Sequence, residues 1–272
     1  LRQLPPHDQR LARSLRDAPT VLGAAGFNFA TDNTRDGMRT TPMRVDGGDA
    51  LTYLHRFPFV LTSLPELQAA AHGQGLVSLR DEAVVRRIPL VAAVGIVPTP
   101  SLALEMLRVA SGSDAIHVTV GAGGIRSVGV AELDVPTQAG GDVWLHFARA
   151  QNVADVRNIS AAELMAGKVS GDALQHKLVL IGLTGSGLND RRVTPLGESV
   201  AGIEIQAQLL ESLLDGHMLL RPWWMPRAEL AILFAVGLAM IVWVPAALAR
   251  HDAQGVRRPR RVGFWVSMIC LL

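Results

Sequence analysis

Side chains that could do chemistry gather in one stretch, residues 182–197, which reads GLTGSGLNDRRVTPLG. Glycines after a strand can present backbone N–H groups to a phosphate, and Ser186 with Asp190 could begin a hydrolytic triad. Both patterns are incomplete. A Walker loop needs Gly-Lys-Ser or Gly-Lys-Thr, and a dinucleotide loop needs G-x-G-x-x-G opening directly into a helix. A serine nucleophile sits in G-x-S-x-G, whereas this segment reads T-G-S-G-L.

The other residue types used in catalysis are scattered along the chain. None of the eight histidines belongs to an H-E-x-x-H motif, and the single cysteine, Cys270, lies in an apolar run. We interpret His72 and His146 as hydrogen-bonded structural residues. The sequence therefore predicts no catalytic residue, no metal site and no cofactor, and this part of the protein is not expected to be an enzyme.

Two roles remain open for the 182–197 segment. In the first, its glycines let the chain leave a central strand sharply, and Asp190 with Thr194 and Pro195 fixes the loop by side-chain-to-backbone hydrogen bonds. In the second, the segment lines a sensor pocket, because open α/β sheets bind ligands at the carboxyl ends of their strands. The predicted ligand-binding residues are Thr184, Ser186, Asn189, Asp190 and Arg191.

The elements that must position this segment alternate between helices and strands. We expect helices after Asp8 and over 100–112, 158–167 and 201–216, and strands over 20–26, 83–95, 115–133 as a hairpin, 142–148 and 176–182. Ser160 and Glu163 form a capping-box pattern, and residues 28–58 look like a long exposed loop. The unbroken apolar run HKLVLIG over 176–182 is typical of a strand buried on both faces. The expected fold class is α/β, a mixed sheet flanked by helices and followed by transmembrane helices.

The C-terminal part has the composition of a membrane anchor. Residues 230–249 carry no charge over twenty positions, which as a helix spans about 30 Å. We expect a transmembrane helix over 227–249, a basic cytoplasmic loop over 250–261, and the start of a second transmembrane helix over 262–272. Residues 1–226 then form the domain on the other side.

Charge predicts the orientation of these segments. The 250–261 loop has five arginines and one aspartate, so its charge is +4 and the rest of the chain contributes −2 to the net +2. Short arginine-rich loops next to membrane spans stay cytoplasmic, so 1–226 is expected to be periplasmic or extracellular. A slightly acidic domain does not suit nucleic acid as a partner. Because an exported domain needs a preceding signal or anchor, we expect an N-terminal span and the first strands to precede Leu1.

A set of motifs follows the 176–182 run in a fixed order: I-G-x-T-x-x-G-x-x-D, then T-P, then a helix beginning G-hydrophobic-E and continuing with Gln and Ala, then R-P. The matching positions are Gly182, Thr184, Gly187, Asp190, Thr194, Pro195, Gly202, Glu204, Gln206, Ala207, Arg221 and Pro222. This pattern resembles the C-terminal half of the CHASE domain of the second type, an extracellular sensory module of bacterial adenylate cyclases, histidine kinases and serine/threonine kinases. The resemblance spans most of residues 8–226 and includes the central VVRRIPLV and PSLALEMLR segments.

Two departures from the family pattern are visible. The family places D-x-D-G just before V-x-R, where this chain has Arg80, Glu82 and Ala83, and Val200-Ala201 stands before Gly202 in place of the usual proline. The resemblance implies structural roles for the motif residues, namely Gly182, Gly187, Thr194, Pro195, Gly202, Glu204, Arg221 and Pro222.

The resemblance implies a sensory input domain of a bacterial signalling protein, held in the inner membrane by several spans. Its expected partners are membrane lipid, a cytoplasmic output domain in the same chain that is a nucleotide cyclase or a kinase, and an unknown extracellular ligand or protein. A homodimer is compatible with this role. Two alternatives remain open, a membrane-anchored periplasmic hydrolase and a structural ectodomain that binds protein partners.

Overall fold

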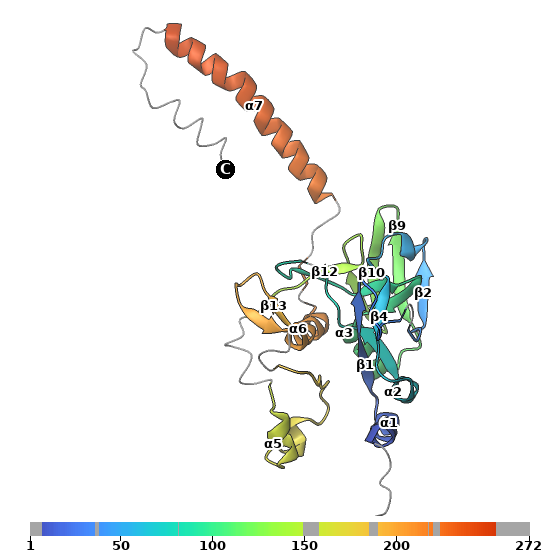
Figure 1. Cartoon of the computed structure of the whole chain (residues 1–272). Coiled ribbons are helices and arrows are strands. Elements are labelled where there is room, and N and C mark those ends of the chain that lie inside the picture. Colours follow the sequence, from blue (N-terminus) through green and yellow to red (C-terminus); the bar gives the residue numbers. More distant parts are fainter. Residues whose placement is uncertain are drawn as a thin grey trace, which may run out of the picture. The chain divides into compact units, whose positions relative to one another are not determined.

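The computed structural model describes residues 7–35, 38–80, 82–148, 158–184, 190–216, 218–219 and 224–253 (Figure 1). The chain divides into two compact units, Leu1–Leu220 and Arg221–Leu272. Among the described residues, the helices of the first unit are α1 (His7–Asp17), α2 (Pro65–Ala70), α3 (Leu102–Ser111), α5 (Ala161–Met165) and α6 (Gly202–Asp215), with short 3-10 turns at Ala50–Thr52 and Gly171–Ala173.

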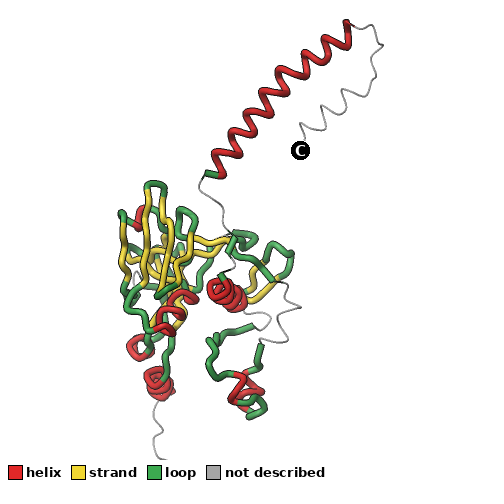
Figure 2. Tube along the Cα trace, turned by 180° about the vertical axis from the view of Figure 1, so that it is seen from behind, coloured by secondary structure: helices red, strands yellow, loops and turns green. Residues whose placement is uncertain are grey.

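The described strands of the first unit form several small sheets (Figure 2). One sheet has β1 (Val21–Phe27) between β4 (Phe59–Leu61) and β5 (Gly73–Leu76). The largest has the order β11 (Leu133–Pro136), β10 (Gly124–Val130), β9 (Ile116–Gly121) and β2 (Met43–Asp46). A third has the order β3 (Arg56–Phe57), β7 (Val91–Val94) and β8 (Val97–Pro100). Two pairs complete the set, β12 (Asp142–Trp144) with β6 (Arg87–Pro89), and β13 (Arg191–Val193) with β14 (Ser199–Ala201).

Parallel and antiparallel pairings occur side by side. β1 pairs with β5 in parallel along 21–24 and with β4 antiparallel along 25–27, and β2 is parallel to β9. The expected α/β class is therefore confirmed, although the described strands form several sheets and not one.

Apolar side chains from these sheets and from two helices make the core. The main cluster packs α3 and α6 against the larger sheet and includes Leu104, Ile116, Ile205 and Leu209, which are fully buried. A second cluster, with Phe57 and Val60, lies beside β1. Every residue of both clusters belongs to the first unit, so this unit carries its own hydrophobic core, as a domain that folds alone requires.

The two core helices begin and end where their sequences predict. Ser101 caps α3 by accepting a hydrogen bond from the Leu104 N–H at 3.3 Å, and Gly112 ends it in the left-handed conformation (φ 68°). Gly216 ends α6 in the same way. Their apolar stripes follow the helical period, so both helices pack against the sheets.

Three predictions about local structure were wrong. Residues 28–58 are not one long loop, because β2 and β3 lie within them and pair with strands far along the chain. Ser160 occupies the N-cap of α5 without making a side-chain cap bond, and α5 buries no residue. Residues 176–182 form no strand, and Figure 2 shows the described part of 158–184 as loops and short helical turns.

The second unit contains a long helix, α7 (Met225–Ala253). Its window Arg227–Val244 is long and apolar enough to cross a membrane, and none of that window is buried. The expected basic loop and second span lie mostly outside the described residues.

Candidate functional site

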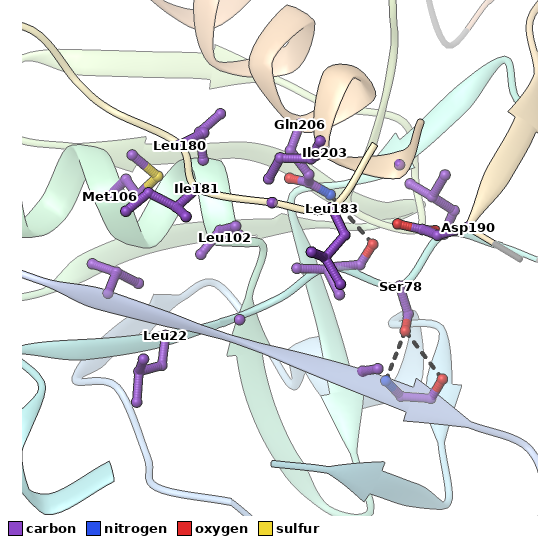
Figure 3. A pocket seen from close by; sticks show the side chains of 18 of the residues that line it. Leu22, Ser78, Leu102, Met106, Leu180, Ile181, Leu183, Asp190, Ile203 and Gln206 are labelled. Carbon is purple, nitrogen blue, oxygen red and sulfur yellow. Dashed lines mark hydrogen bonds between the residues drawn. The ribbon is translucent and has the colours of Figure 1, made fainter. Parts of the chain in front are cut away.

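A groove of about 1120 Å³ runs through the first unit (Figure 3). One wall is made by β1 and by the face of α3 that carries Leu102 and Met106. The opposite wall is made by residues 177–183 and by the first turns of α6. These walls come from parts of the sequence about 70 to 185 residues apart, so only the folded chain brings them together.

The 177–183 segment is the unusual wall of this groove. Its residues are aliphatic for the most part, yet no strand pairs with it among the described residues. Ile181 is 92% exposed and Leu183 is 71% exposed, which is far from the two-sided burial that the sequence predicted. A run of side chains with strong strand preference becomes a strand only where a neighbouring strand accepts its backbone hydrogen bonds. Here the groove lies where such a neighbour would be.

The β1 wall has an open edge. Residues 21–24 are paired with β5 on one side, but on the β4 side their backbone has no strand partner among the described residues. The chain just after β5 is held against β1 by Ser78. The Ser78 hydroxyl accepts from the Gly26 N–H at 2.7 Å and donates to the Gly26 carbonyl at 3.1 Å (Figure 3). This wall is therefore fixed, whereas the 177–183 wall lacks strand pairing.

A buried ion pair lies within α3, between two residues one turn of the helix apart. Glu105 is fully buried and accepts from Arg108 through both carboxylate oxygens, Nε to Oε2 at 2.9 Å and Nη2 to Oε1 at 2.8 Å. This hydrogen bond to Glu105 raises the pKa of Arg108 more than burial lowers it. Arg108 also donates from Nη1 to the Ser113 carbonyl at 3.0 Å, so the pair is bonded to the turn that ends α3, while Leu102 and Met106 of the same helix line the groove.

Gln206 supplies a buried polar group at the α6 wall. Its side chain is 2% exposed, and its Nε2 donates to the Val77 carbonyl over 3.4 Å (Figure 3). Because the Val77 carbonyl can only accept, the amide nitrogen must face it, and the amide oxygen must point elsewhere. That oxygen, Oε1, is buried and has no hydrogen-bond partner in the described structure.

Asp190 meets the start of α6 at the same end of the groove. The Gly202 N–H donates to the Asp190 backbone carbonyl at 2.9 Å, and a Cβ at position 202 would lie 2.6 Å from the Asp190 carboxylate oxygens. Only glycine at 202 lets the carboxylate rest against the helix N-terminus, where a negative charge is favourable. The 182–197 segment is thereby connected to α6.

Charged side chains border the groove on several sides. Arg80 forms an ion pair with Asp142 at 2.5 Å, and burial raises the pKa of Asp142 more than Arg80, and then Arg87, lower it. Lys177 and Arg192 also line the groove, opposite in charge to Asp190. Of the described charged residues that line the groove, Arg80 is paired with Asp142, which leaves Lys177, Asp190 and Arg192 for a ligand.

The predicted ligand-binding residues have different positions. Asp190 lines the groove, while Thr184 is exposed just after the groove-lining Leu183. Arg191 begins β13, where its Nε donates to the Ser199 hydroxyl at 3.2 Å and its guanidinium also bonds the Ser199 carbonyl. Ser186 and Asn189 lie outside the described residues.

The motif residues expected to be structural fall at turns and element ends. Gly182 lines the groove, and Gly202 and Glu204 begin α6. Thr194 and Pro195 form the turn of the β13–β14 hairpin, where the Thr194 N–H donates to the Glu198 carbonyl and the Thr194 carbonyl accepts from Gly197. Gly187, Arg221 and Pro222 lie outside the described residues.

Sequence reasoning missed most of the groove. Leu22, Met106 and Ile203 are ordinary apolar residues of a strand or helix, so no local pattern marks them as lining a cavity. Gln206 did carry a signal, because it is one of the family-motif positions on the helix that begins at Gly202. Within the described residues, no group of three His, Cys, Asp or Glu side chains could hold a metal ion.

Comparison with known proteins gives one positive result. A family model described as the CHASE2 domain matches residues 1–243, which covers the whole first unit and most of α7. Curated proteins and solved structures gave no significant match.

Proposed function

Because the chain belongs to the CHASE2 family of extracellular sensory domains, we propose that its groove is the site where a stimulus is received. In this proposal a ligand enters between β1 and the 177–183 segment and changes the position of α6. The observation that carries the proposal is that the groove lies between one fixed wall, β1, and one wall, the 177–183 segment, that has no strand partner among the described residues.

The two walls suggest two states of the domain. In one, the 177–183 segment stays unpaired and its apolar side chains face water. In the other, a ligand fills the groove and covers those side chains, so the segment and the start of α6 move toward β1. A ligand shifts such an equilibrium only by binding one state more tightly, and couplings of this kind are about 1 to 3 kcal/mol.

The route from the groove toward the membrane follows the chain. Asp190 contacts the first residue of α6, and α6 ends at Gly216. Leu219 then donates its backbone N–H to the Trp144 carbonyl at 3.4 Å, which ties the end of the first unit to β12. A displacement of α6 would therefore pull on this attachment and on the residues that lead into α7.

The membrane arrangement is part of the proposal. α7 would cross the membrane, the basic 250–261 loop would lie in the cytoplasm, and 262–272 would begin a second span. The cytoplasmic output domain would be a nucleotide cyclase or a protein kinase, the first unit would lie in the periplasm, and the chain would work as a homodimer.

A reporter fusion tests the proposal. An export signal is placed before Leu1 and a nucleotide-cyclase catalytic domain after Ala253, and cyclic nucleotide is measured in cells together with protease access to the first unit. We expect proteases to reach the first unit from outside the inner membrane. We also expect the cyclase output to change when groove residues are substituted.

Three results would contradict the proposal. A first unit that proteases cannot reach from outside would overturn the topology. Hydrolase activity of the first unit toward ester or phosphoester substrates would favour the enzyme alternative. Output that is insensitive to every groove variant, combined with capture of a defined protein partner, would favour a structural ectodomain.

A further inference from the structure

The groove walls are suited to hydrocarbon. The side chains that face it from β1, α3 and the 177–183 segment include Leu22, Leu102, Met106, Leu180 and Ile181 (Figure 3). Ile181 and Leu183 are among the most exposed large apolar residues of the described first unit. Covering such side chains releases water from apolar surface, so an apolar ligand gains affinity with each methylene that it buries.

One buried polar atom sits in the wall beside this apolar surface. The Gln206 Oε1 has no partner in the described structure, and a buried acceptor without a donor is costly. The oxygen itself is covered, so a ligand reaches it only when the Gln206 side chain moves toward the groove, which breaks the 3.4 Å bond to Val77. That bond is long and therefore weak, and after the movement the Val77 carbonyl also needs a donor, from water or from the ligand. The ligand group that satisfies this oxygen must carry an O–H or N–H.

The charges at the groove do not select a charged ligand. The lining residues Lys177, Arg192 and Asp190 together carry a charge of +1, but all three are exposed, so water screens their charges. A charged group that entered between the apolar walls would lose its water without a buried partner of opposite charge. The polar group that fits best is therefore uncharged.

We infer that the groove binds an uncharged amphiphile, with a hydrocarbon body between β1 and the 177–183 segment and a hydroxyl or amide group that donates to Gln206. This inference rests on the proposed sensory function, and it adds the chemical class of the stimulus.

A homologous series of small probes tests the inference. Straight-chain primary alcohols from 1-butanol to 1-octanol, and for each alcohol the methyl ether with the same number of carbon atoms, are titrated into residues 1–220, which contain the core and both groove walls. Affinity is read from the shift of cooperative urea unfolding. We expect the dissociation constant to fall about fourfold with each added methylene, and each ether to bind about two- to tenfold more weakly than its alcohol.

Two variants separate the parts of the groove. Gln206→Leu should keep the dependence on chain length but abolish the difference between alcohol and ether. Met106→Trp should weaken the longer alcohols most, because the indole takes up groove volume. Ile96→Trp adds the same side chain at an exposed turn outside the groove and should leave every affinity unchanged. The same comparison is made with the whole chain in nanodiscs, where alcohols also partition into lipid. Because this partition is the same for the wild type and for Met106→Trp, it cancels in the difference between their affinities.

Three outcomes would overturn the inference. Affinity that does not depend on chain length would remove the hydrocarbon body. Equal binding of alcohol and ether to the wild type would remove the donor to Gln206. Fatty acids that bind more tightly than alcohols of equal length, with the advantage lost in Arg192→Gln, would replace the uncharged group by an anion.

The sensory role and the ligand class are tested by different results. Alcohol binding without any change in reporter output would refute the sensory role of the groove and leave the ligand class intact. Output that depends on groove variants without any alcohol binding would refute the ligand class alone.

Discussion

Filling the groove with a larger side chain should not destabilise the protein, in contrast with the same change in the sealed core. The comparison uses two positions of α3, Met106, which is partly buried and lines the groove, and Leu104, which is fully buried. At Leu104, tryptophan has no free volume, and overpacking of this kind costs about 1 to 3 kcal/mol. At Met106, the 1120 Å³ groove can accept the indole.

The magnitude at Met106 follows from buried area. An indole that buries roughly 50 Å² more apolar surface than methionine gains about 1 kcal/mol at about 25 cal/mol per Å². We therefore expect the free energy of unfolding of Met106→Trp to be unchanged or up to about 1 kcal/mol higher, which for a domain of this size is about 2 to 4 °C in Tm. Leu104→Trp should lower the free energy of unfolding.

The assay is urea unfolding of residues 1–220, monitored by circular dichroism, with Ile96→Trp as the surface control. A loss at Met106 equal to the loss at Leu104 would refute the reasoning, because it would mean that the groove is closed in solution.

Three further predictions concern the fold and its pH dependence. Burial, and then the charge of Arg80, lower the pKa of His55 from its ordinary 6.5. As the pH falls, the unfolded chain therefore binds a proton at this histidine before the folded chain does. The free energy of unfolding should decrease as the pH falls below about 6.5. His55→Phe keeps the ring contact with Phe57 and should show a smaller loss between pH 7.5 and pH 5 in urea titrations; an equal loss would assign the effect to other groups. Glu105→Gln removes the charge that pairs with Arg108 and should cost about 2 to 4 kcal/mol, measured by the same unfolding, whereas a neutral result would contradict a stabilising role for this buried pair within α3. Gly75→Ala should cost about 3 kcal/mol or abolish folding, because its Cβ would lie 2.5 Å from the backbone of α3, and a wild-type Tm would contradict that close approach.

Helices were predicted well from the sequence because their signals are local. α3 and α6 each combine an apolar stripe of helical period with a glycine that can adopt the left-handed conformation at the C-terminus. These signals lie within one segment, so no distant residue can change them. The hairpin of β9 and β10 was predicted for the same reason, since its two strands are neighbours in sequence.

Strands that depend on distant partners were predicted poorly. β2 is four residues long and pairs with β9, about 70 residues later, so nothing within the polar 28–58 region marks it as a strand. The 177–183 segment is the opposite case. Its composition predicted a buried strand, but in the fold a groove occupies the place of a partner, and its side chains are exposed. Composition reports the preference of a segment, whereas pairing depends on the whole chain.

The candidate site shows the same division. Asp190 was predicted from its loop to bind a ligand, which stays a prediction, and the structure places it on the groove. The apolar walls could not be foreseen, because Leu22, Met106 and Ile203 become neighbours only after β1, α3 and α6 are assembled.

The output of the cyclase fusion in the Met106→Trp variant tests most directly whether the groove receives the stimulus. If the groove controls α6, filling it favours one of the two states, and basal output should differ from the wild type by about fivefold or more, the lower end of typical coupling between sites. Ile96→Trp should match the wild type. A folded, membrane-inserted Met106→Trp fusion with wild-type output and an unaltered response would contradict a sensory role for the groove.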